Sequence, residues 1–157
     1  MAQFTGKSTR TFEPDAQSPQ RVTSVGYSYT VARDGNVSGT QRSIGCVPAG
    51  AIFNPTASRV HVEEAFNGTS PTLAVFLVPK STETIDGTAI IPTGAVTAGT
   101  TGIYRGTDAN FKSAGHHDYL TEDHEAIVQF GAGASDATTG KARVVLVFDH
   151  DGVTGVN

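Results

Sequence analysis

KARVVLVFDH, at residues 141–150, has an apolar side chain at every second position. These positions are Ala142, Val144, Leu146 and Phe148. Successive side chains of a β-strand point to opposite faces of its sheet, so the alternation predicts a strand with one buried face. The stretch indicates a sheet that is apolar on the inside and polar on the outside.

The same two-residue period recurs along the chain. Residues 22–31, 58–66 and 125–130 each predict a strand with one apolar face. The residues expected on these buried faces are Val25, Tyr27, Tyr29, Val31, Val60, Val62, Phe66, Ala126, Val128 and Phe130. Glu64 interrupts the second pattern, so that strand either ends early or has Glu64 at an edge. An Asp-Gly turn is expected at 33–36.

Three further segments are expected to be extended. Residues 43–53 predict two short strands around the bend Pro48-Ala49-Gly50. Residues 72–78 are apolar on both faces, which is typical of a central strand covered on both sides. Residues 80–115 give a weaker pattern, with short apolar segments at 89–91 and 103–104. A helical turn is expected only near 121–125.

Turn residues divide the chain into short segments, because 18 glycines and 7 prolines are scattered along it. Roughly eight strands in one domain favour an all-β fold, an antiparallel two-sheet β-sandwich of the jelly-roll type. Residues 1–21 are polar, contain two prolines and lack apolar periodicity, so they predict an extended N-terminal arm. Residues 22–157 are expected to form the sandwich domain.

Composition excludes several classes of protein. The net charge is -4 and no basic run is present, so binding to nucleic acid is not expected. No apolar stretch approaches the roughly 18 residues that span a bilayer, and no secretory signal is recognisable at Met1. The single cysteine, Cys46, excludes an internal disulfide and is expected to be a small buried hydrophobe.

One polar cluster invites a metal-site interpretation. His116, His117 and Asp118 are followed by acidic residues and His124 at 122–125. Adjacent histidines on a strand point to opposite faces, and the spacing matches neither the helical zinc motif nor an EF-hand, so a solvated or interfacial loop is favoured. The run Asp149-His150-Asp151-Gly152 is interpreted as a plain turn.

Catalytic motifs are absent from the sequence. No serine has the Gly-x-Ser-x-Gly setting and no glycine loop with lysine is present to hold a phosphate. Glu63 and Glu64 are adjacent on a strand and are expected to face apart. The sequence therefore predicts a protein without catalytic residues, metal or cofactor.

Three stretches carry a resemblance to a known group of proteins. They are VPAGA at 47–51, AFNGTSPTL at 65–73 and TTGKARVVLVF at 138–148. Together they resemble the small β-sandwich structural proteins encoded in tailed-bacteriophage head gene clusters, over residues 43–149. The shared positions are turn and core residues.

This resemblance implies a non-enzymatic virion structural protein, a capsid decoration (cement) protein. Such a protein binds the major capsid protein, stabilises its shell from the outer surface and is commonly a homotrimer. It is made in the host cytoplasm and carried on the virion. By analogy, the capsid contact is expected in residues 1–21, with Phe4 and Phe12 as apolar anchors and Arg10 and Arg21 as polar ones.

Two other functions compete with this interpretation. The chain would also suit a tail- or surface-associated module that binds a receptor glycan, although it has no tryptophan and few aromatic residues for a sugar platform. A metal-dependent enzyme on a cupin-like sandwich would require His116, His117 and His124 to converge with a carboxylate.

Overall fold

The structure is a computed structural model and describes residues 21–85, 88–116, 119–131 and 137–150. These residues form eight strands, which are β1 (Arg21–Thr30), β2 (Thr40–Val47), β3 (Ala51–Phe53), β4 (Arg59–Glu64), β5 (Thr72–Pro79), β6 (Gly102–Tyr104), β7 (His124–Gly131) and β8 (Lys141–His150). The short helical elements are α2 (Val31–Asp34), η1 (Thr93–Ala95) and α3 (Asp108–Ser113).

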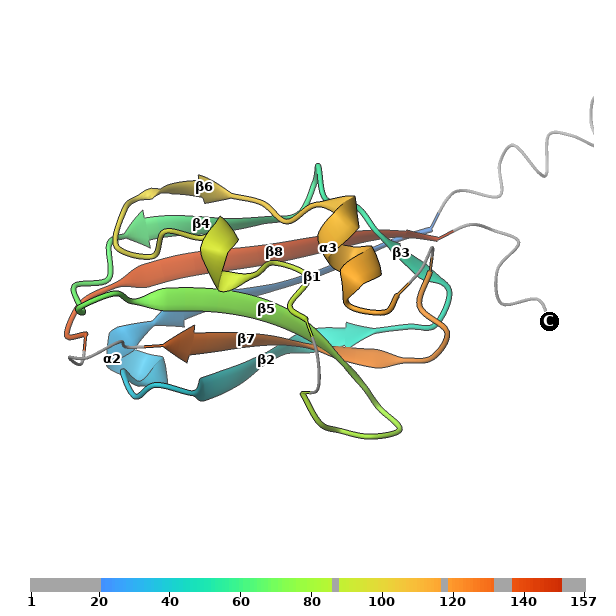
Figure 1. Ribbon diagram of the computed structural model, residues 1–157, viewed down its shortest axis with the longest axis horizontal. Coiled ribbons are helices and arrows are strands. Elements are labelled where there is room, and N and C mark those ends of the chain that lie inside the picture. Colours follow the sequence, from blue (N-terminus) through green and yellow to red (C-terminus); the bar gives the residue numbers. More distant parts are fainter. Residues whose placement is uncertain (1–20, 86–87, 117–118, 132–136, 151–157) are drawn as a thin grey trace, which may run out of the picture.

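The strands form two antiparallel sheets that pack face to face (Figure 1). One sheet, here called sheet A, has the order β1-β8-β4-β6, with β3 also paired to β8. The other, sheet B, has the order β2-β7-β5. The chain passes repeatedly from one sheet to the other, which is the connectivity of a jelly roll. The all-β sandwich expected from the sequence is confirmed.

The core lies between the inner faces of the sheets. Every alternating apolar position predicted in β4, β7 and β8 is buried, as are Tyr29 and Val31. Tyr29 stacks on Phe130 across the two sheets, with 5.6 Å between ring centroids. Val25 and Tyr27 are only half buried, because β1 is the last strand of sheet A.

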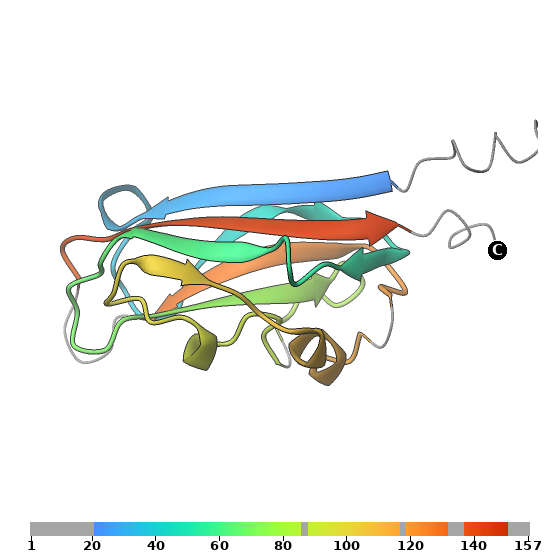
Figure 2. The same ribbon diagram turned by 90° about the horizontal axis from the view of Figure 1, so that it is seen from above.

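The segment between β5 and β7 fills the side of the sandwich away from β1, where η1 and α3 lie (Figure 2). Its core residues are Ile90, Ile91, Val96, Ala98, Phe111 and Leu120. Helix α3 begins with a capping box, because the Thr107 hydroxyl accepts from the Asn110 N–H and the Asn110 side chain accepts from the Thr107 N–H. This cap positions Phe111 against Phe53. The segment between β5 and β7, for which the sequence pattern gave the weakest prediction, therefore completes the core.

The expectation of a central strand at 72–78 is wrong in one respect. Strand β5 is at the end of sheet B, and beyond it residue Val75 forms only an isolated bridge to Ile91. Its outward-facing residues Ala74 and Val78 are nevertheless 2% and 4% exposed. An apolar residue at every position thus indicated burial on both faces but not the place of the strand in the sheet.

Cys46 is exposed, which contradicts the expected burial. The pairing of β2 with β7 shifts between Ser43 and Gly45, so a bulge reverses which residues face inward. Ile44 and Val47 point into the core as a result. Gly45 has φ of 154°, and a Cβ there would lie 3.0 Å from Cγ1 of Val25.

Residues 121–125, Glu64 and residues 149–150 were each given an expected local structure. The helical turn expected near 121–125 is not formed, because residues 124 and 125 already belong to β7. Strand β4 ends at Glu64, which is exposed after a register shift, so the first of the two alternatives for Glu64 is confirmed. Asp149 and His150 lie in β8 rather than in a turn.

Candidate functional site

His116 and His124 lie side by side, and the contact between them is packing of one imidazole ring against the other. Their centroids are 4.9 Å apart in an edge-to-face arrangement, and His116 also packs against Phe111. His124 is 3% exposed, and its Nδ1 is 2.8 Å from the carbonyl oxygen of Glu122. His117 and Asp118 lie outside the described residues.

A metal centre gains no support from this geometry. Within the described ranges, no group of three or more histidine, cysteine, aspartate or glutamate residues is arranged to hold an ion. Two imidazoles alone fall short of the three or four protein ligands that a zinc site uses. The pair therefore serves to extend the aromatic stack of Phe53 and Phe111 toward β7.

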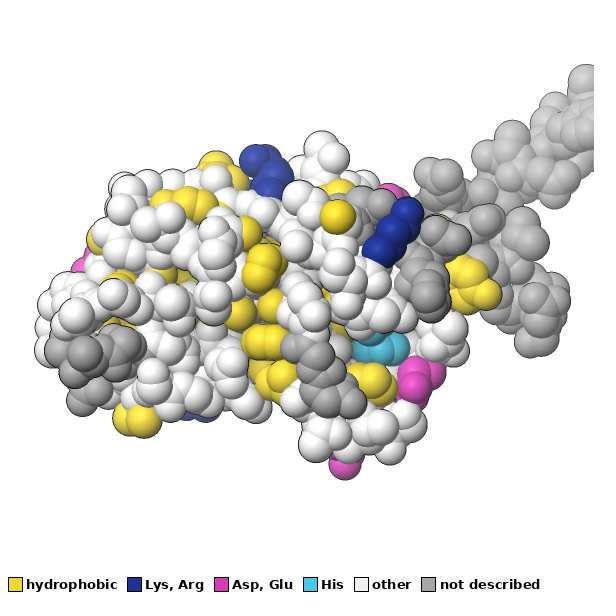
Figure 3. Space-filling view, viewed as in Figure 1, with side chains coloured by type: hydrophobic (Ala, Val, Ile, Leu, Met, Phe, Trp, Pro, Cys, Tyr) yellow, Lys and Arg dark blue, Asp and Glu magenta, His cyan; other side chains and the backbone are white. Residues whose placement is uncertain are grey.

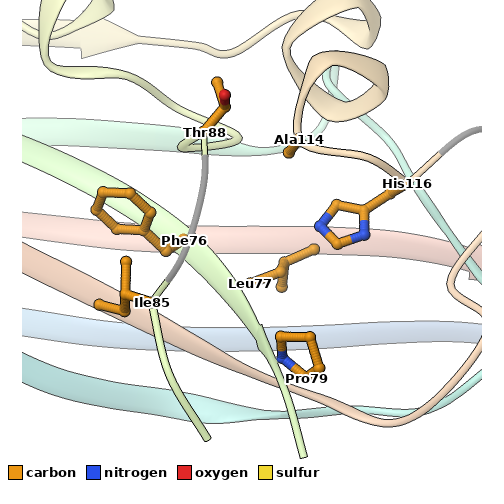
Figure 4. Close-up of a pocket in the computed structure, with 7 residues that line it drawn as sticks. All are labelled: Phe76, Leu77, Pro79, Ile85, Thr88, Ala114 and His116. Carbon is orange, nitrogen blue, oxygen red and sulfur yellow. The ribbon is translucent and has the colours of Figure 1, made fainter. Parts of the chain in front are cut away.

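Beside His116 is a pocket of about 50 Å³ (Figure 4). The residues that line it are Phe76, Leu77, Pro79, Ile85, Thr88, Ala114 and His116. Figure 3 shows hydrophobic side chains gathered over β5 on this face. Ligand sites typically enclose 300–1,000 Å³, so this pocket is too small for an organic substrate.

A broader depression of about 470 Å³ is lined by residues 55–56 and 105–107. Its lining residues are Pro55, Thr56, Arg105, Gly106 and Thr107, none of which is aromatic. The Arg105 guanidinium donates to the carbonyl oxygen of Thr56. A sugar platform needs exposed aromatic faces, so the depression gives no support to glycan binding.

Glu63 and Glu64 do not form a pair of catalytic carboxylates. Glu63 is on the outer face of sheet A, where it forms ion pairs with Lys141 at 2.8 Å and Arg143 at 3.1 Å. The hydrogen bond from Lys141, together with the nearby charges of Arg143, holds the pKa of Glu63 below its usual range. The carboxylate is therefore ionised and already paired.

Asp149 and His150 hold β8 to its neighbours. Asn54 donates a 2.9 Å hydrogen bond to the Asp149 carboxylate, and His150 Nε2 is 2.7 Å from the Thr23 hydroxyl. Asp149 thus contacts the residue that follows β3, whereas His150 contacts β1. Asp151 and Gly152 lie outside the described residues.

The four residues predicted to contact a capsid lie almost entirely outside the described structure. Phe4, Arg10 and Phe12 are not described, whereas Arg21 is the first residue of β1 and pairs with His150 of β8. The predicted arm thus joins the sandwich at the end where β8 finishes. This register fixes the attachment point of residues 1–20 and of residues 151–157 at the same end.

Two exposed apolar side chains lie at this end, which we call the arm end. Val22, next to Arg21, is 58% exposed. Tyr119 is 46% exposed, and its neighbour Leu120 donates a backbone hydrogen bond to Ala51, the register partner of His150. Val22 is two residues before Ser24 on the same strand, so the strand period predicts that its side chain points outward. Tyr119 is not in a strand, and no periodic pattern predicts its exposure.

A membrane-spanning helix is not found in the described part of the chain, where each helix is too short. No protein-family model matches the chain, and no curated protein matches it. Among solved structures, the chain is similar to a chain in "Capsid of Ralstonia phage GP4", with a TM-score of 0.55 and 17% sequence identity. The similarity covers 83% of this chain and 85% of that one, and it shows that the two share the sandwich fold.

Proposed function

We propose that this chain is a non-enzymatic capsid decoration protein of a tailed bacteriophage, which binds the major capsid protein and stabilises the assembled shell. The observation that carries the proposal is the fold shared with a chain of the Ralstonia phage GP4 capsid over most of both chains. Because 83% of one chain matches 85% of the other, the two are of similar length. The likeness therefore extends over a whole small subunit.

The surface of the sandwich is consistent with a role in binding protein. The His116–His124 contact, the Glu63 ion pairs and the Asp149–Asn54 hydrogen bond all serve packing or strand pairing. The arm end combines exposed Val22 and Tyr119 with the attachment point of residues 1–20. A polar arm can cover a neighbouring subunit while using little of the domain surface.

The contact that we propose includes Phe4, Arg10, Phe12 and Arg21 on the arm. Several copies bound to one shell, or a homotrimer seated at a threefold position, would gain affinity because each further contact forms at high effective concentration. The protein would be made in the host cytoplasm and carried on the outside of the virion. The homotrimer and its position stay predictions that follow from the resemblance.

The test is co-sedimentation of the full-length protein with mature shells that lack it, followed by electron microscopy of the pelleted particles. We expect saturable binding and added density on the shell surface. Two sets of variants locate the contact: Phe4→Ser with Phe12→Ser on the arm, and Val22→Ser with Tyr119→Ser at the arm end. Each set is expected to weaken binding about tenfold or more, since truncation of an interface anchor of this size costs about 1 kcal/mol or more.

Val37→Ser is the matched control. Val37 is 63% exposed and follows α2, at the opposite end of the sandwich from Arg21. Its replacement is expected to leave shell binding unchanged. Shells that bind no protein would refute the proposal, and an effect of Val37→Ser equal to that of the arm variants would refute the assignment of the contact.

A further inference from the structure

Strand β1 is an edge strand of unusual regularity. It is the last strand of sheet A, and its ten residues pair with β8 without a break, from Arg21–His150 to Thr30–Lys141. Figure 2 shows β1 at the margin of the sandwich, with no strand beyond it. A long, unbroken edge is a template on which another strand can pair.

Three hydrogen bonds fix which backbone groups of β1 face outward. The Val31 N–H, one residue beyond β1, donates to Gly140 at 3.1 Å, so odd-numbered residues face β8. By contrast, the Thr30 N–H donates to Asp34 at 2.8 Å and the Ser28 carbonyl accepts from Arg33, so even-numbered residues face away from β8. The outward groups of the first half of the strand therefore belong to Val22, Ser24 and Gly26.

Among the residues that the structure describes, those that cap this edge lie along its second half. The outward N–H of Thr30 donates to the Asp34 side chain, and the outward C=O of Ser28 accepts from the Arg33 side chain. Within the described residues, the outward N–H and C=O groups of Val22, Ser24 and Gly26 have no hydrogen-bond partner, and all three residues are exposed. For Gly26, which has no side chain, exposure means that the backbone itself is open to solvent.

The other strands at sheet edges carry features that prevent pairing. Strand β2 has a bulge between Ser43 and Gly45. Strand β6 has three residues, and β5 is bridged at Val75 by Ile91. Short length, bulges and covering segments are the means by which natural proteins block edge-to-edge association. As far as the described residues go, the first half of β1 has none of these, and residues 22–27 include neither proline nor a charged side chain.

We propose that this open edge pairs with the same edge of a second copy of the chain, antiparallel and about a twofold axis at Ser24. In this register Ser24 of one copy lies opposite Ser24 of the other, and Val22 lies opposite Gly26. Each of these pairs exchanges two backbone hydrogen bonds, because the outward groups of both copies belong to even-numbered residues. A twofold contact of this kind is closed and uses the same patch on both copies.

The length of the open edge is what selects a second copy as the occupant. The twofold register places Arg21 of one copy opposite Tyr27 of the other, so the shared ladder runs over residues 21–27 on both sides. The cap begins at Ser28, one residue beyond this ladder, so it does not overlap residues 21–27 of the second copy. No like charges lie opposite each other in the ladder. On the outer face of the sheet, Ser24 has a small side chain and Gly26 has none.

The pairing would also set the spacing of the arms. In an antiparallel pair the two arm attachment points, at Arg21 of each copy, are at opposite ends of the shared ladder, about 20 Å apart. If the arms bind a shell as proposed above, one dimer presents two arms to it. The pairing itself does not depend on that function, and its test needs no shell.

The first test is sedimentation equilibrium of the full-length protein over a wide range of concentrations. We expect a reversible monomer–dimer equilibrium, and a homotrimer, the state that the resemblance implies, would overturn the pairing. Ser24→Pro removes an outward N–H that pairs with no described group of the chain, and is expected to weaken the dimer about tenfold or more while the folded spectrum is kept. Ser28→Pro is the matched control, because it is the same change at an outward position beyond the ladder, and it is expected to dimerise like the parent.

The second test uses cysteine crosslinking and does not depend on the proline variants folding. In a Cys46→Ser background, Ser24→Cys is expected to form a crosslinked dimer on mild oxidation, because residues opposite each other in such a ladder have Cα atoms about 5.5 Å apart. Ser28→Cys in the same background is expected to stay uncrosslinked. A chain that is monomeric at all concentrations, an oligomer that Ser24→Pro leaves intact, or equal crosslinking at both positions would each overturn the proposal.

Discussion

The phenol hydroxyl of Tyr27 donates a 2.6 Å hydrogen bond to Oδ1 of Asp34, which ties β1 to the turn that follows it. Asp34 is 4% exposed and also accepts from the Thr30 N–H and from the guanidinium of Arg33. Burial alone would raise the pKa of this carboxyl, but the hydrogen bonds from Arg33, Tyr27 and Thr30 outweigh it and lower the pKa to about 2. Asp34 is thus a buried carboxylate that folding keeps ionised.

This depressed pKa predicts an acid-dependent loss of stability. The pKa in the folded state is below the ordinary value of 3.8, so the stabilisation is complete at neutral pH and is lost as the pH falls from about 5 toward 2. A shift of this size corresponds to about 2 kcal/mol. Urea unfolding is expected to show that Asp34→Asn is about 2 kcal/mol less stable than the parent at pH 7, with the difference closing near pH 2.

Asp123→Asn is the control for this prediction. Its carboxylate is exposed and accepts from the Ala49 N–H, a hydrogen bond that an amide oxygen can also accept. The variant is expected to follow the pH dependence of the parent. A constant difference between Asp34→Asn and the parent across the whole pH range would contradict the assignment to ionisation of Asp34.

The period of two identified β4, β7 and β8 because each has one face in the core and no break in its pairing over the alternating positions. Where the pairing of a strand is irregular, the two-residue period no longer predicts which side chains are buried. The bulge at Ser43–Gly45 turned Cys46 outward, and a bulge cannot be read from the residues on either side of it. The place of β5 in sheet B depends on long-range pairing, which the composition of the strand does not encode.

The segment at 88–120 shows a different limit. Its buried residues, among them Ile90 and Phe111, are spaced irregularly because they reach the core from loops and a six-residue helix. Neither the strand period nor the helix period applies to such a segment. The same is true of the β1 edge, because its open half is defined by contacts of Arg33 and Asp34 that only the folded chain reveals.

Exposure of Cys46 predicts a reactive thiol in the folded protein. The residue is on the outer face of sheet B, opposite Glu125 of β7. Ellman's reagent is therefore expected to modify one thiol per chain in native buffer, at a rate close to that of the urea-unfolded chain. Protection of the thiol until the protein unfolds would mean that Cys46 faces the core after all.

The part played by α3 in the core predicts a large effect of truncating Phe111. This side chain is 1% exposed and stacks on Phe53, with 5.6 Å between ring centroids. Phe111→Ala is expected to lower the free energy of unfolding by about 3–5 kcal/mol, as measured in urea. Ser113→Ala, at an exposed position of the same helix, is expected to change it by less than about 0.5 kcal/mol. A loss below about 1 kcal/mol for Phe111→Ala would show that this segment does not complete the core.

Gly140 predicts a strong steric effect of adding a side chain. Its φ is 143°, and a Cβ there would lie 2.2 Å from the ring of Phe66, which is itself 2% exposed. Gly140→Ala is therefore expected to cost about 2–4 kcal/mol in urea unfolding, from the overlap and from backbone strain together. Gly94→Ala, where a Cβ meets nothing within 4 Å, is expected to be neutral or slightly stabilising.

Shortening the facing side chain separates the two contributions at Gly140. Phe66→Leu alone removes core contacts with Tyr29 and Phe130 and is expected to destabilise the protein. Combined with Gly140→Ala it also relieves the overlap, so the double variant is expected to lose less stability than the two single changes added together. Additive losses would mean that strain at the positive φ, and not the contact with Phe66, makes glycine necessary at position 140.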